Sequence, residues 1–388
     1  MRGSVLTFGV IGCGSIGGFL ARLLSREDKE LADRARLAAV AGRDPARAGA
    51  LAAEVGCAAT DVAGLLARRD VDAVLVCTPS GTHARLAEDA LRAGKHVLVE
   101  KPVDVTPQTA DRLISVARET GRTLGVVSQH RFDPAARLAR TAIASGRLGR
   151  ITTVMTELAW WRGSAYYSSG TWRGTPALDG GGALMNQAIH AVDLVQWLAG
   201  PVVEVAAHTA LLAHPGIEVE DVATASLRFA NGALGTLLAT TAAYPGRTAR
   251  TAVNGDRGSV VIDNDELAYL HLARHGEDAP AYGAFGAADQ SAEYAAELVR
   301  DPARDASGLL YQPHRDQLLD FCDAVREGRP PLVDGVAGRQ AVAVVTAIYA
   351  SARTGRPLRV DTVTPAGISH TPRFDMKSPK TDQQTTGE

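Results

Sequence analysis

Apolar residues along the first third of the chain occur in short runs separated by amphipathic stretches. The short apolar runs, which predict buried strands, are Val5–Ile11, Arg36–Ala41, Ala73–Cys77, His96–Val99 and Thr123–Val127. The stretches between them, which predict helices, include Pro45–Val55, Thr82–Ala93 and Pro107–Thr120. Strands that alternate with helices in this way form a parallel sheet with helices on both faces. Ligands of such sheets bind beyond the carboxyl ends of the strands.

The pattern changes after about residue 130. A helix is expected at Asp133–Ser145, a strand at Ile151–Leu158 and a helical stretch at Gly180–Leu198. Longer alternating runs then predict strands at Val202–Leu211, Val219–Phe229, Ala233–Thr241, Thr248–Val253 and Ser259–Ile262. Turns such as Asn231-Gly232 between consecutive runs favour an antiparallel or mixed sheet. Two late helices, Pro313–Arg326 and Gly335–Arg353, are expected to close the fold.

These patterns divide the chain into three parts. We expect an N-terminal Rossmann domain at residues 1–128 and a C-terminal α/β domain at residues 129–365. Residues 275–310 are rich in Ala, Asp and Gly and are expected to form a long surface loop. The polar tail, residues 366–388, is expected to be disordered.

A glycine-rich turn follows the first predicted strand directly. Its sequence is Gly12-Cys13-Gly14-Ser15-Ile16-Gly17, and an apolar helical pattern comes next. The first glycine allows a tight turn, the second lets backbone N–H groups approach a pyrophosphate, and the third lets the helix pack on the strand. The helix N-terminus also attracts an anion. Glycine-rich turns close ordinary βα units too, but a strand before and a helix after favour dinucleotide binding by Gly12, Gly14, Ser15, Ile16 and Gly17.

The end of the second predicted strand bears on the choice of cofactor. An NAD-specific fold normally places a carboxylate there, whereas an arginine favours the 2′-phosphate of NADP. The residues here are Gly42-Arg43-Asp44-Pro45. Asp44 before Pro45 is typical of a helix N-cap, so capping already accounts for this carboxylate. Arg43 therefore tilts the prediction from NAD towards NADP.

Two further groups of residues suggest catalysis. Lys101 lies at the end of a buried strand and is followed by Pro102. In this position its cation can stabilise an alkoxide. The alternative is that Lys101 is an ordinary surface lysine. Asp179-Gly180-Gly181-Gly182 precedes a helical stretch in which Asn186, His190 and Asp193 share one side. Histidine suits proton transfer, although a lone histidine is more often structural. Asp193 either orients the imidazole or pairs with an arginine.

The ordered set of motifs resembles the Gfo/Idh/MocA oxidoreductases, relatives of glucose–fructose oxidoreductase and inositol 2-dehydrogenase. The motifs are the glycine-rich turn, Cys77-Thr78-Pro79-Ser80-x-x-His83, Glu100-Lys101-Pro102 and Gly180-Gly181-Gly182 with His190, and the likeness spans residues 5 to about 360. The resemblance implies that Lys101 and His190 are the catalytic pair and that the Lys101-Pro102 bond is cis. It also implies a large open, mostly antiparallel C-terminal sheet that joins subunits into a homo-dimer or homo-tetramer. Besides the glycine turn, the expected cofactor-binding residues are Arg43, Thr78, Pro79, His83, Glu100, Lys101 and Gln129.

The substrate side resembles family members that act on sugars or nucleotide-linked sugars. This likeness rests on Tyr166-Tyr167, on Gly170-Thr171-Trp172-Arg173-Gly174 and on Leu184-Met185-Asn186-Gln187. Tyr166 and Trp172 are expected to stack on sugar faces, with core packing as the alternative for the aromatic pairs. Arg131, Arg173 and Asn186 are expected to bind hydroxyls or a carboxylate. Many family dehydrogenases have Asp where this chain has Asn186, which cannot take a proton, so the proton transfer is assigned to His190 and Lys101.

The expected activity is therefore hydride transfer between NAD or NADP and a secondary hydroxyl or ketone of a sugar. The residues do not determine the direction, the sugar or the carbon. The alternative of a different class is a non-catalytic NAD(P)-binding sensor, because the resembled family includes a repressor. Retention of both Lys101 and His190 favours turnover over the sensor and over a purely structural protein.

Composition excludes several other classes. The 388 residues are 46% hydrophobic and 22% charged, with a net charge of −2 and no block of like charges, so neither nucleic acid nor membrane is an expected partner. No segment resembles a membrane span or a secretory signal. The four cysteines are scattered, which predicts no metal site and no disulfide framework, and favours the cytoplasm.

Overall fold

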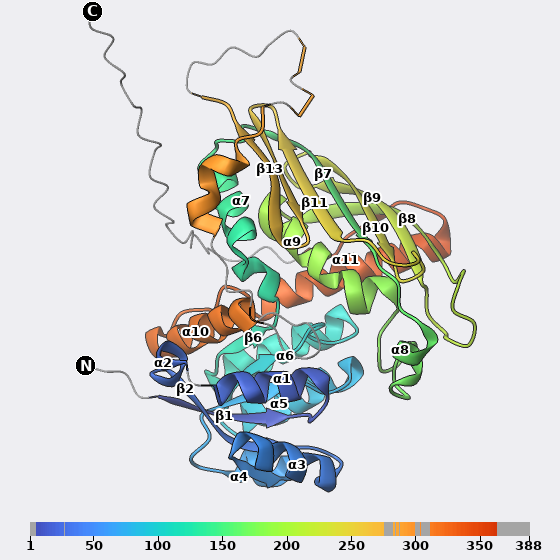
Figure 1. Ribbon diagram of the computed structural model, residues 1–388. Helices are drawn as coiled ribbons and strands as arrows, with labels where there is room; N and C mark the ends of the chain where they lie inside the picture. The colour runs from blue at the N-terminus through green and yellow to red at the C-terminus, as the bar shows by residue number, and fades with distance from the viewer. Residues whose placement is uncertain are drawn as a thin grey trace, which may run out of the picture.

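The computed structural model describes residues 5–26, 28–274, 282–283, 285–286, 288–298, 303 and 311–362. The expected tail at 366–388 and most of the expected loop at 275–310 lie outside these residues. The chain forms two layered halves, one around each of two sheets (Figure 1).

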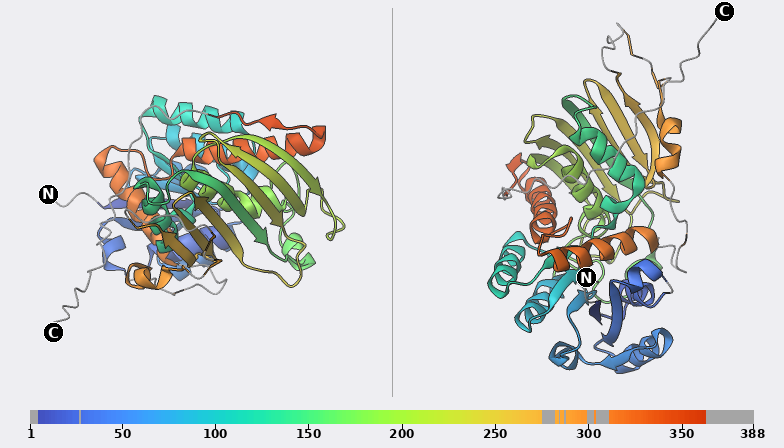
Figure 2. Two further views of the ribbon diagram at one scale, coloured as in Figure 1. Left: turned by 90° about the horizontal axis from the view of Figure 1, so that it is seen from above. Right: turned by 90° about the vertical axis from the view of Figure 1, so that its left-hand side faces the viewer.

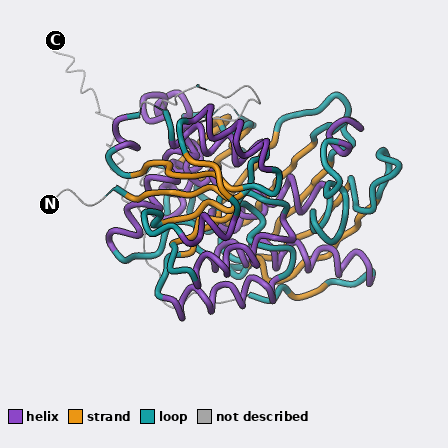
Figure 3. Tube along the Cα trace, turned by 90° about the horizontal axis from the view of Figure 1, so that it is seen from below, coloured by secondary structure: helices purple, strands orange, loops and turns teal. Residues whose placement is uncertain are grey.

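The N-terminal half is a parallel sheet with helices on both sides, as predicted (Figure 3). Its strands are β1 (Leu6–Ile11), β2 (Ala35–Ala41), β3 (Ala58–Thr60), β4 (Ala73–Val76), β5 (His96–Val99) and β6 (Leu124–Val126). Its helices are α1 (Ser15–Leu24), α2 (Lys29–Ala32), α3 (Pro45–Val55), α4 (Val62–Ala67), η1 (Ser80–Thr82), α5 (His83–Arg92) and α6 (Pro107–Thr120). The strand order is β3-β2-β1-β4-β5-β6, so the order reverses between β1 and β4. A ligand crevice opens beyond the strand ends at such a reversal.

Local capping explains where several of these helices begin. Asp44 accepts hydrogen bonds from the backbone N–H groups of Ala46 and Arg47, and Pro45 is the first residue of α3. The N-cap interpretation of Asp44 is thus confirmed. The short elements β3, α2 and α4 were not predicted, because each has too few residues to show a period.

The C-terminal half is an eight-stranded sheet in the order β13-β12-β11-β7-β10-β9-β8-β14. Its strands are β7 (Ile151–Ala159), β8 (Val202–Ala210), β9 (Val222–Phe229), β10 (Leu234–Thr240), β11 (Ala249–Gly255), β12 (Gly258–Asp263), β13 (Glu266–Leu272) and β14 (Leu358–Arg359). Only β7 and β10 pair in parallel, so the expected mixed, mostly antiparallel sheet is confirmed. The sequence prediction missed β13 and β14; β13 follows its hairpin partner after only the Asn264-Asp265 turn.

Helices cover one face of this sheet and leave the other open (Figures 1 and 2). The remaining helical elements are η2 (Gln129–Phe132), α7 (Pro134–Ala144), α8 (Ser164–Ser168), η3 (Ala183–Ala188), α9 (Ile189–Ala199), η4 (Ser291–Leu298), α10 (Tyr311–Glu327) and α11 (Gly335–Thr354). Among them, α7, α9 and α11 contact the covered face. The 3₁₀ helix η4 corrects the expectation of a continuous loop over 275–310, because its Tyr294 is buried against the core.

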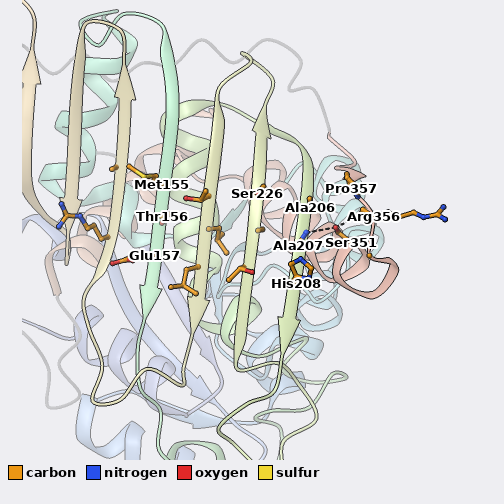
Figure 4. A pocket seen from close by; sticks show the side chains of 18 of the residues that line it. Met155, Thr156, Glu157, Ala206, Ala207, His208, Ser226, Ser351, Arg356 and Pro357 are labelled. Atoms are coloured by element: carbon orange, nitrogen blue, oxygen red, sulfur yellow. Dashed lines mark hydrogen bonds between the residues drawn. The ribbon is translucent and has the colours of Figure 1, made fainter. Parts of the chain in front are cut away.

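The open face of the sheet is hollowed and mixed in character. Figure 4 shows Met155 and Glu157 on β7, Ser226 on β9 and His208 on β8 around this hollow. Met155 is half exposed, which is unusual for a side chain in the middle of a central strand.

Helix α10 returns from the C-terminal part of the chain to the N-terminal sheet. The ring centroid of its Phe321 lies 6.2 Å from that of Phe8 in β1. The ring of Phe19 in α1 stacks on that of Tyr311, with 5.1 Å between their centroids. Leu318 and Cys322 belong to the same buried cluster. The core of the first half is therefore completed by residues that follow seven of the eight strands of the second sheet, β7 to β13.

Candidate active site

The glycine-rich turn has the geometry of a phosphate cradle. Gly12 has a φ of +107°, and a Cβ there would collide with the backbone of Cys77. A Cβ on Gly17 would collide with the Gly12 carbonyl, so only glycine lets α1 pack this closely. Gly14, by contrast, faces open space. Helix α1 starts at Ser15, and no side chain caps its N-terminus. The backbone N–H groups at this end, including those of Ser15 and Ile16, can therefore bind an anion.

One buried acceptor atom at the carboxyl edge of the sheet, Oε1 of Glu100 at the end of β5, has no hydrogen-bond partner among the described residues. The side-chain amide of Gln129, which follows β6, lies 3.3 Å from Nε2 of His130. A buried acceptor without a donor is costly, and the hydroxyls and amide of a nicotinamide riboside could supply donors. Burial raises the pKa of Glu100 to about 7, against the opposing effect of Lys101. Together with the open space at Gly14, these atoms fit a dinucleotide.

The turn after β4 is held in place by His83. Its Nδ1 lies 2.7 Å from the carbonyl of Pro102, and its Nε2 lies 2.7 Å from the carbonyl of Thr78. His83 is 1% exposed, so both ring nitrogens are occupied by the protein itself. The imidazole joins the Thr78-Pro79 turn to the Lys101-Pro102 turn and offers no nitrogen to a cofactor.

Lys101 crosses from the sheet edge to the second half of the molecule. The Lys101–Pro102 bond is cis, as the resemblance implied. Lys101 Nζ donates a hydrogen bond of 2.7 Å to the carbonyl of Asn186. Burial lowers the pKa of Lys101, while the carboxylates of Glu100 and Asp179 oppose this shift.

The segment before His190 is wound more loosely than predicted. Residues Ala183–Ala188 form a π-helix, and the α-helix begins only at Ile189. His190 and Asp193 lie three residues apart in α9 and line one pocket, as expected, whereas Asn186 lies in the π-helix, where its Nδ2 donates to Asp179. Sequence periodicity could not reveal this, because π-turns are rare and often lie at functional sites.

His190 lies next to Lys101 in one small pocket between the two halves. Both residues line it together with Pro102, Val126, Val127 and Ser128. Burial lowers the pKa of His190 well below its usual value, and the positive charges of Lys101, His130 and His314 add to this effect. A neutral imidazole beside a lysine is equipped to accept a proton.

A second histidine, His130, contacts the first. Their ring centroids are 4.9 Å apart in a T-shaped arrangement. Nδ1 of His130 lies 2.8 Å from Asp265 and 3.1 Å from Asp133, so both carboxylates accept from one ring N–H. Burial opposes its charge, but the two aspartates outweigh burial and raise the pKa of His130 well above its usual value. The two carboxylates therefore favour the charged form of the His130 ring, which lies against the ring of His190.

Arg131 is bound within the protein. Its guanidinium forms two hydrogen bonds to Asp193, of 2.5 and 2.7 Å, and Ser128 Oγ donates to the same carboxylate. Arg131 is 7% exposed. Of the two alternatives for Asp193, the structure shows the pairing with an arginine. Arg131 thereby holds α9 against the strand end, and no part of its fork faces the His190 pocket.

The substrate side is a network around Tyr166. Its hydroxyl accepts from Arg173 Nη1 at 2.7 Å and from Gln187 Nε2 at 2.6 Å. Arg173 also lies over the rings of Tyr166 and Trp172. Gln187 in turn reaches Asn186, which connects the network to Lys101.

The structure places the remaining expected cofactor-binding residues, Arg43 and Thr78, after the carboxyl ends of β2 and β4 in the Rossmann sheet. Arg43 is exposed at the end of β2, and the hydroxyl of Thr78 lies 2.8 Å from that of Thr82. Sequence reasoning missed His130, Asp265, Arg162 and the role of Asp179. Their positions depend on contacts over tens of residues, and only Asp179, just before the three glycines, carried a local signal.

Comparisons with known proteins agree with this geometry. The family model for the NAD-binding Rossmann fold of the Gfo/Idh/MocA oxidoreductases matches residues 6–128, and the model for the C-terminal alpha/beta domain matches residues 140–360. No helix among the described residues is long and apolar enough to cross a bilayer.

Three relatives illustrate the range of the family. The chain is 33% identical to an inositol 2-dehydrogenase of Rhizobium meliloti over 69% of this chain and 78% of the relative. It is 30% identical to a UDP-N-acetylglucosamine 3-dehydrogenase of Acidithiobacillus ferrooxidans over 86% of this chain and 93% of the relative. The WlbA dehydrogenase of Bordetella pertussis, solved with NADH and UDP-GlcNAcA, superposes with a TM-score of 0.77 at 31% identity, covering 93% of this chain and all of that one. The chain therefore belongs to the Gfo/Idh/MocA oxidoreductases, with an NAD-binding Rossmann half and a C-terminal α/β half.

Proposed function

We propose that this protein oxidises a secondary hydroxyl of a sugar or nucleotide sugar, with reversible hydride transfer to a nicotinamide dinucleotide. The observation that carries the proposal is that Lys101 and His190 line one pocket at the carboxyl edge of the Rossmann sheet. The relatives that act on inositol and on UDP-N-acetylglucosamine support a polyhydroxylated substrate.

His190 acts as the general base for oxidation. Its neutral imidazole takes the hydroxyl proton while the C–H bond breaks and the carbon becomes a ketone carbon. The ammonium of Lys101 stabilises the oxygen as negative charge develops. The bound dinucleotide supplies one function, acceptance of the hydride. In the reverse direction, His190 returns the proton to the alkoxide.

The other site residues position these two groups. Asn186 holds Lys101 through its backbone carbonyl, and its side chain is committed to Asp179, so Asn186 takes no proton. Tyr166 and Trp172 present rings, and Arg173 presents a cation, towards the sugar. Arg131 and His83 are positioning residues, because all their polar contacts are with the protein.

The cofactor is bound by the glycine turn, Thr78, Pro79, Glu100, Lys101 and Gln129. The NADH-bound neighbour supports NAD, whereas Arg43 and the capping role of Asp44 support NADP. We propose that Arg43 contacts the 2′ end of the adenosine ribose and strengthens NADPH binding. Titration of NADH and NADPH, followed by fluorescence, decides the preference; equal or tighter binding of NADH refutes it.

The open face of the C-terminal sheet is the proposed subunit interface. It is hollowed, and it exposes Met155 and Leu234 among polar side chains. Burying such a face against a second copy removes apolar surface from water. The four cysteines are all free, which supports the reducing cytoplasm.

The decisive experiment is a spectrophotometric screen of free sugars, inositols and nucleotide sugars with NAD and NADP, repeated with Lys101→Met and His190→Ala. Each variant is expected to lose about 10²–10⁴-fold in kcat/KM while still binding cofactor. Near wild-type turnover in either variant would falsify the assigned roles. Cofactor binding without turnover on any substrate would instead favour the sensor.

A further inference from the structure

We propose that the substrate carries an anionic oxygen group, a carboxylate or phosphate, that binds to Arg162 and Arg173 beside Tyr166. This inference rests on the proposed function and extends the same site, since it names the charge of the sugar that is oxidised.

The two guanidinium groups both lie near one aromatic ring, that of Tyr166. Arg162 follows β7 and lies 5.3 Å from the centre of the Tyr166 ring, while Arg173 follows α8 and lies 4.2 Å from it. Each arginine also contacts a tryptophan, Trp160 at 4.9 Å and Trp172 at 4.5 Å. The aromatic rings therefore fix two planar cations in a partly buried position.

Their hydrogen bonds inside the protein are to neutral groups. Arg162 Nη2 donates to Gln187 Oε1 at 3.1 Å, and Arg173 donates to the hydroxyls of Tyr166 and Ser169. In the part of the chain that the structure describes, neither arginine forms a salt bridge. Moreover, Nε of Arg162 is buried and has no hydrogen-bond partner there. Arg131 and Arg339, by comparison, are paired with carboxylates. A buried guanidinium without a counter-charge is costly unless a ligand supplies one.

The charge balance near the reacting centre supports the same conclusion. Near the catalytic lysine, the cations of Lys101, Arg162 and Arg173 lie close to the two carboxylates of Glu100 and Asp179. Asp179 already accepts from Gly174 N–H at 2.8 Å and from Asn186. Burial lowers the pKa of Lys101, the carboxylates of Glu100 and Asp179 oppose this shift, and the charges of Arg173 and Arg162 add to it. An anion on the substrate would neutralise this excess and bring the sugar to Lys101.

Hydrogen bonds connect the proposed subsite to the catalytic pair. Tyr166 hydroxyl binds Gln187, Gln187 binds Asn186, and the Asn186 carbonyl binds Lys101 Nζ. A group held by the arginines therefore orients the sugar relative to Lys101 and His190. We infer that Arg162 and Arg173 determine specificity rather than perform chemistry. The solved neighbour that contains UDP-GlcNAcA agrees with a substrate that carries negative charge.

The test measures a preference and how two variants change it. Four substrates that share a sugar ring separate the sources of charge: a neutral sugar, the sugar acid, the UDP-sugar and the UDP-sugar acid. For the wild type we expect the charged member of at least one pair to have a kcat/KM at least tenfold above its neutral partner. Arg162→Gln and Arg173→Gln should each reduce that ratio about tenfold, towards one, because each removes one partner of a partly buried charge pair.

The matched control is Arg150→Gln, which removes the same charge from an exposed residue whose contact with Asp256 is 3.9 Å long. This variant should keep the wild-type ratio. Circular dichroism and Tm show whether the two site variants fold, and Arg173→Lys, which retains charge without the planar fork, supplies a milder change. Calorimetric titration of the anionic sugar into protein with NADH gives the same comparison without turnover.

The outcomes separate the inference from the function on which it rests. If the variants lower the preference for a sugar acid over the matching sugar without the carboxylate, the bound anion is the carboxylate. If they lower the preference for a UDP-sugar over the matching free sugar, the bound anion is the diphosphate. Equal rates on charged and neutral sugars, or ratios unchanged in both variants, overturn the anion subsite while the dehydrogenase activity stands. A wild type that oxidises none of the four, nor any other sugar, refutes the proposed function itself.

Discussion

The cofactor half of the site is made by backbone, and the substrate half is made by side chains. Around the dinucleotide cradle, the decisive features are the missing Cβ atoms of Gly12 and Gly17 and the free N–H groups of α1. Around the sugar, they are contacts such as Lys101 to Asn186, which join residues 85 positions apart. The first kind of site tolerates almost no change of shape, whereas the second can be retuned one residue at a time.

The largest expected effect tests whether long-range pairing holds the substrate half together. Asp193→Asn leaves the guanidinium of Arg131 buried without its counter-charge, which should cost about 3–5 kcal/mol of unfolding free energy. Urea denaturation followed by fluorescence measures this loss. The control is Asp89→Asn, which breaks an exposed pair with Arg85 and should cost less than about 1 kcal/mol. Equal losses in the two variants would show that the buried pair is not special.

A smaller effect is expected from adding one methyl group to the cradle. In Gly17→Ala the new Cβ meets the Gly12 carbonyl, a backbone atom that cannot move aside cheaply, so we expect a loss of about 1–3 kcal/mol. In Gly14→Ala the methyl enters open space, so Tm should stay nearly unchanged while NADH binding weakens. If Gly14→Ala binds NADH as the wild type does, the pyrophosphate does not approach this residue.

The smallest effect concerns the two histidines. His190 must be neutral to accept the proton, so activity in oxidation rises as pH passes above its pKa. The cation of His130 helps to keep that pKa low, and His130→Asn should therefore raise it and move the acid limb of the kcat/KM profile to higher pH. Two unit charges about 5 Å apart in a water-like medium interact by about 0.8 kcal/mol, or about 0.6 pH unit.

The controls for this shift are built into the same cluster. Asp265→Asn removes one of the two carboxylates that bind Nδ1 of His130. It should move the acid limb of the kcat/KM profile in the same direction by a smaller amount. Lys101 and His314 also face His190 and remain in place in both variants. A profile that stays fixed in His130→Asn assigns the limb to another group.

The two halves also differ in how far the sequence alone could describe them. The longer strands and helices of the first half and the glycine roles follow from local patterns: an apolar run, a turn, then an amphipathic helix. Asp44 was recognised as a cap because its partners are two and three residues away. The π-turn at Ala183–Ala188, by contrast, depends on Glu220, which accepts from Gly182 and Leu184 across the sheet.

The candidate site shows the same division. Lys101 and His190 were found because each stands in a short motif, beside proline or after three glycines. Arg131 was expected to bind the substrate, whereas its guanidinium is paired with Asp193, which is 62 residues away in the sequence. Arg162, His130 and Asp265 had no motif, since what makes them notable is the charge that other segments place around them.

Helix α10 has a consequence for how the molecule comes into being. Phe321, Leu318 and Cys322 are buried in the hydrophobic cluster of the first sheet, yet the ribosome adds them after both halves have been almost entirely translated. The nascent nucleotide-binding half thus emerges with an uncovered apolar surface. This surface remains uncovered while nearly two hundred further residues are translated, at a rate of about 5–20 residues per second. Folding of the first half is therefore coupled to completion of the polypeptide. A truncated chain that ends after the first half would expose this apolar surface and be prone to aggregate.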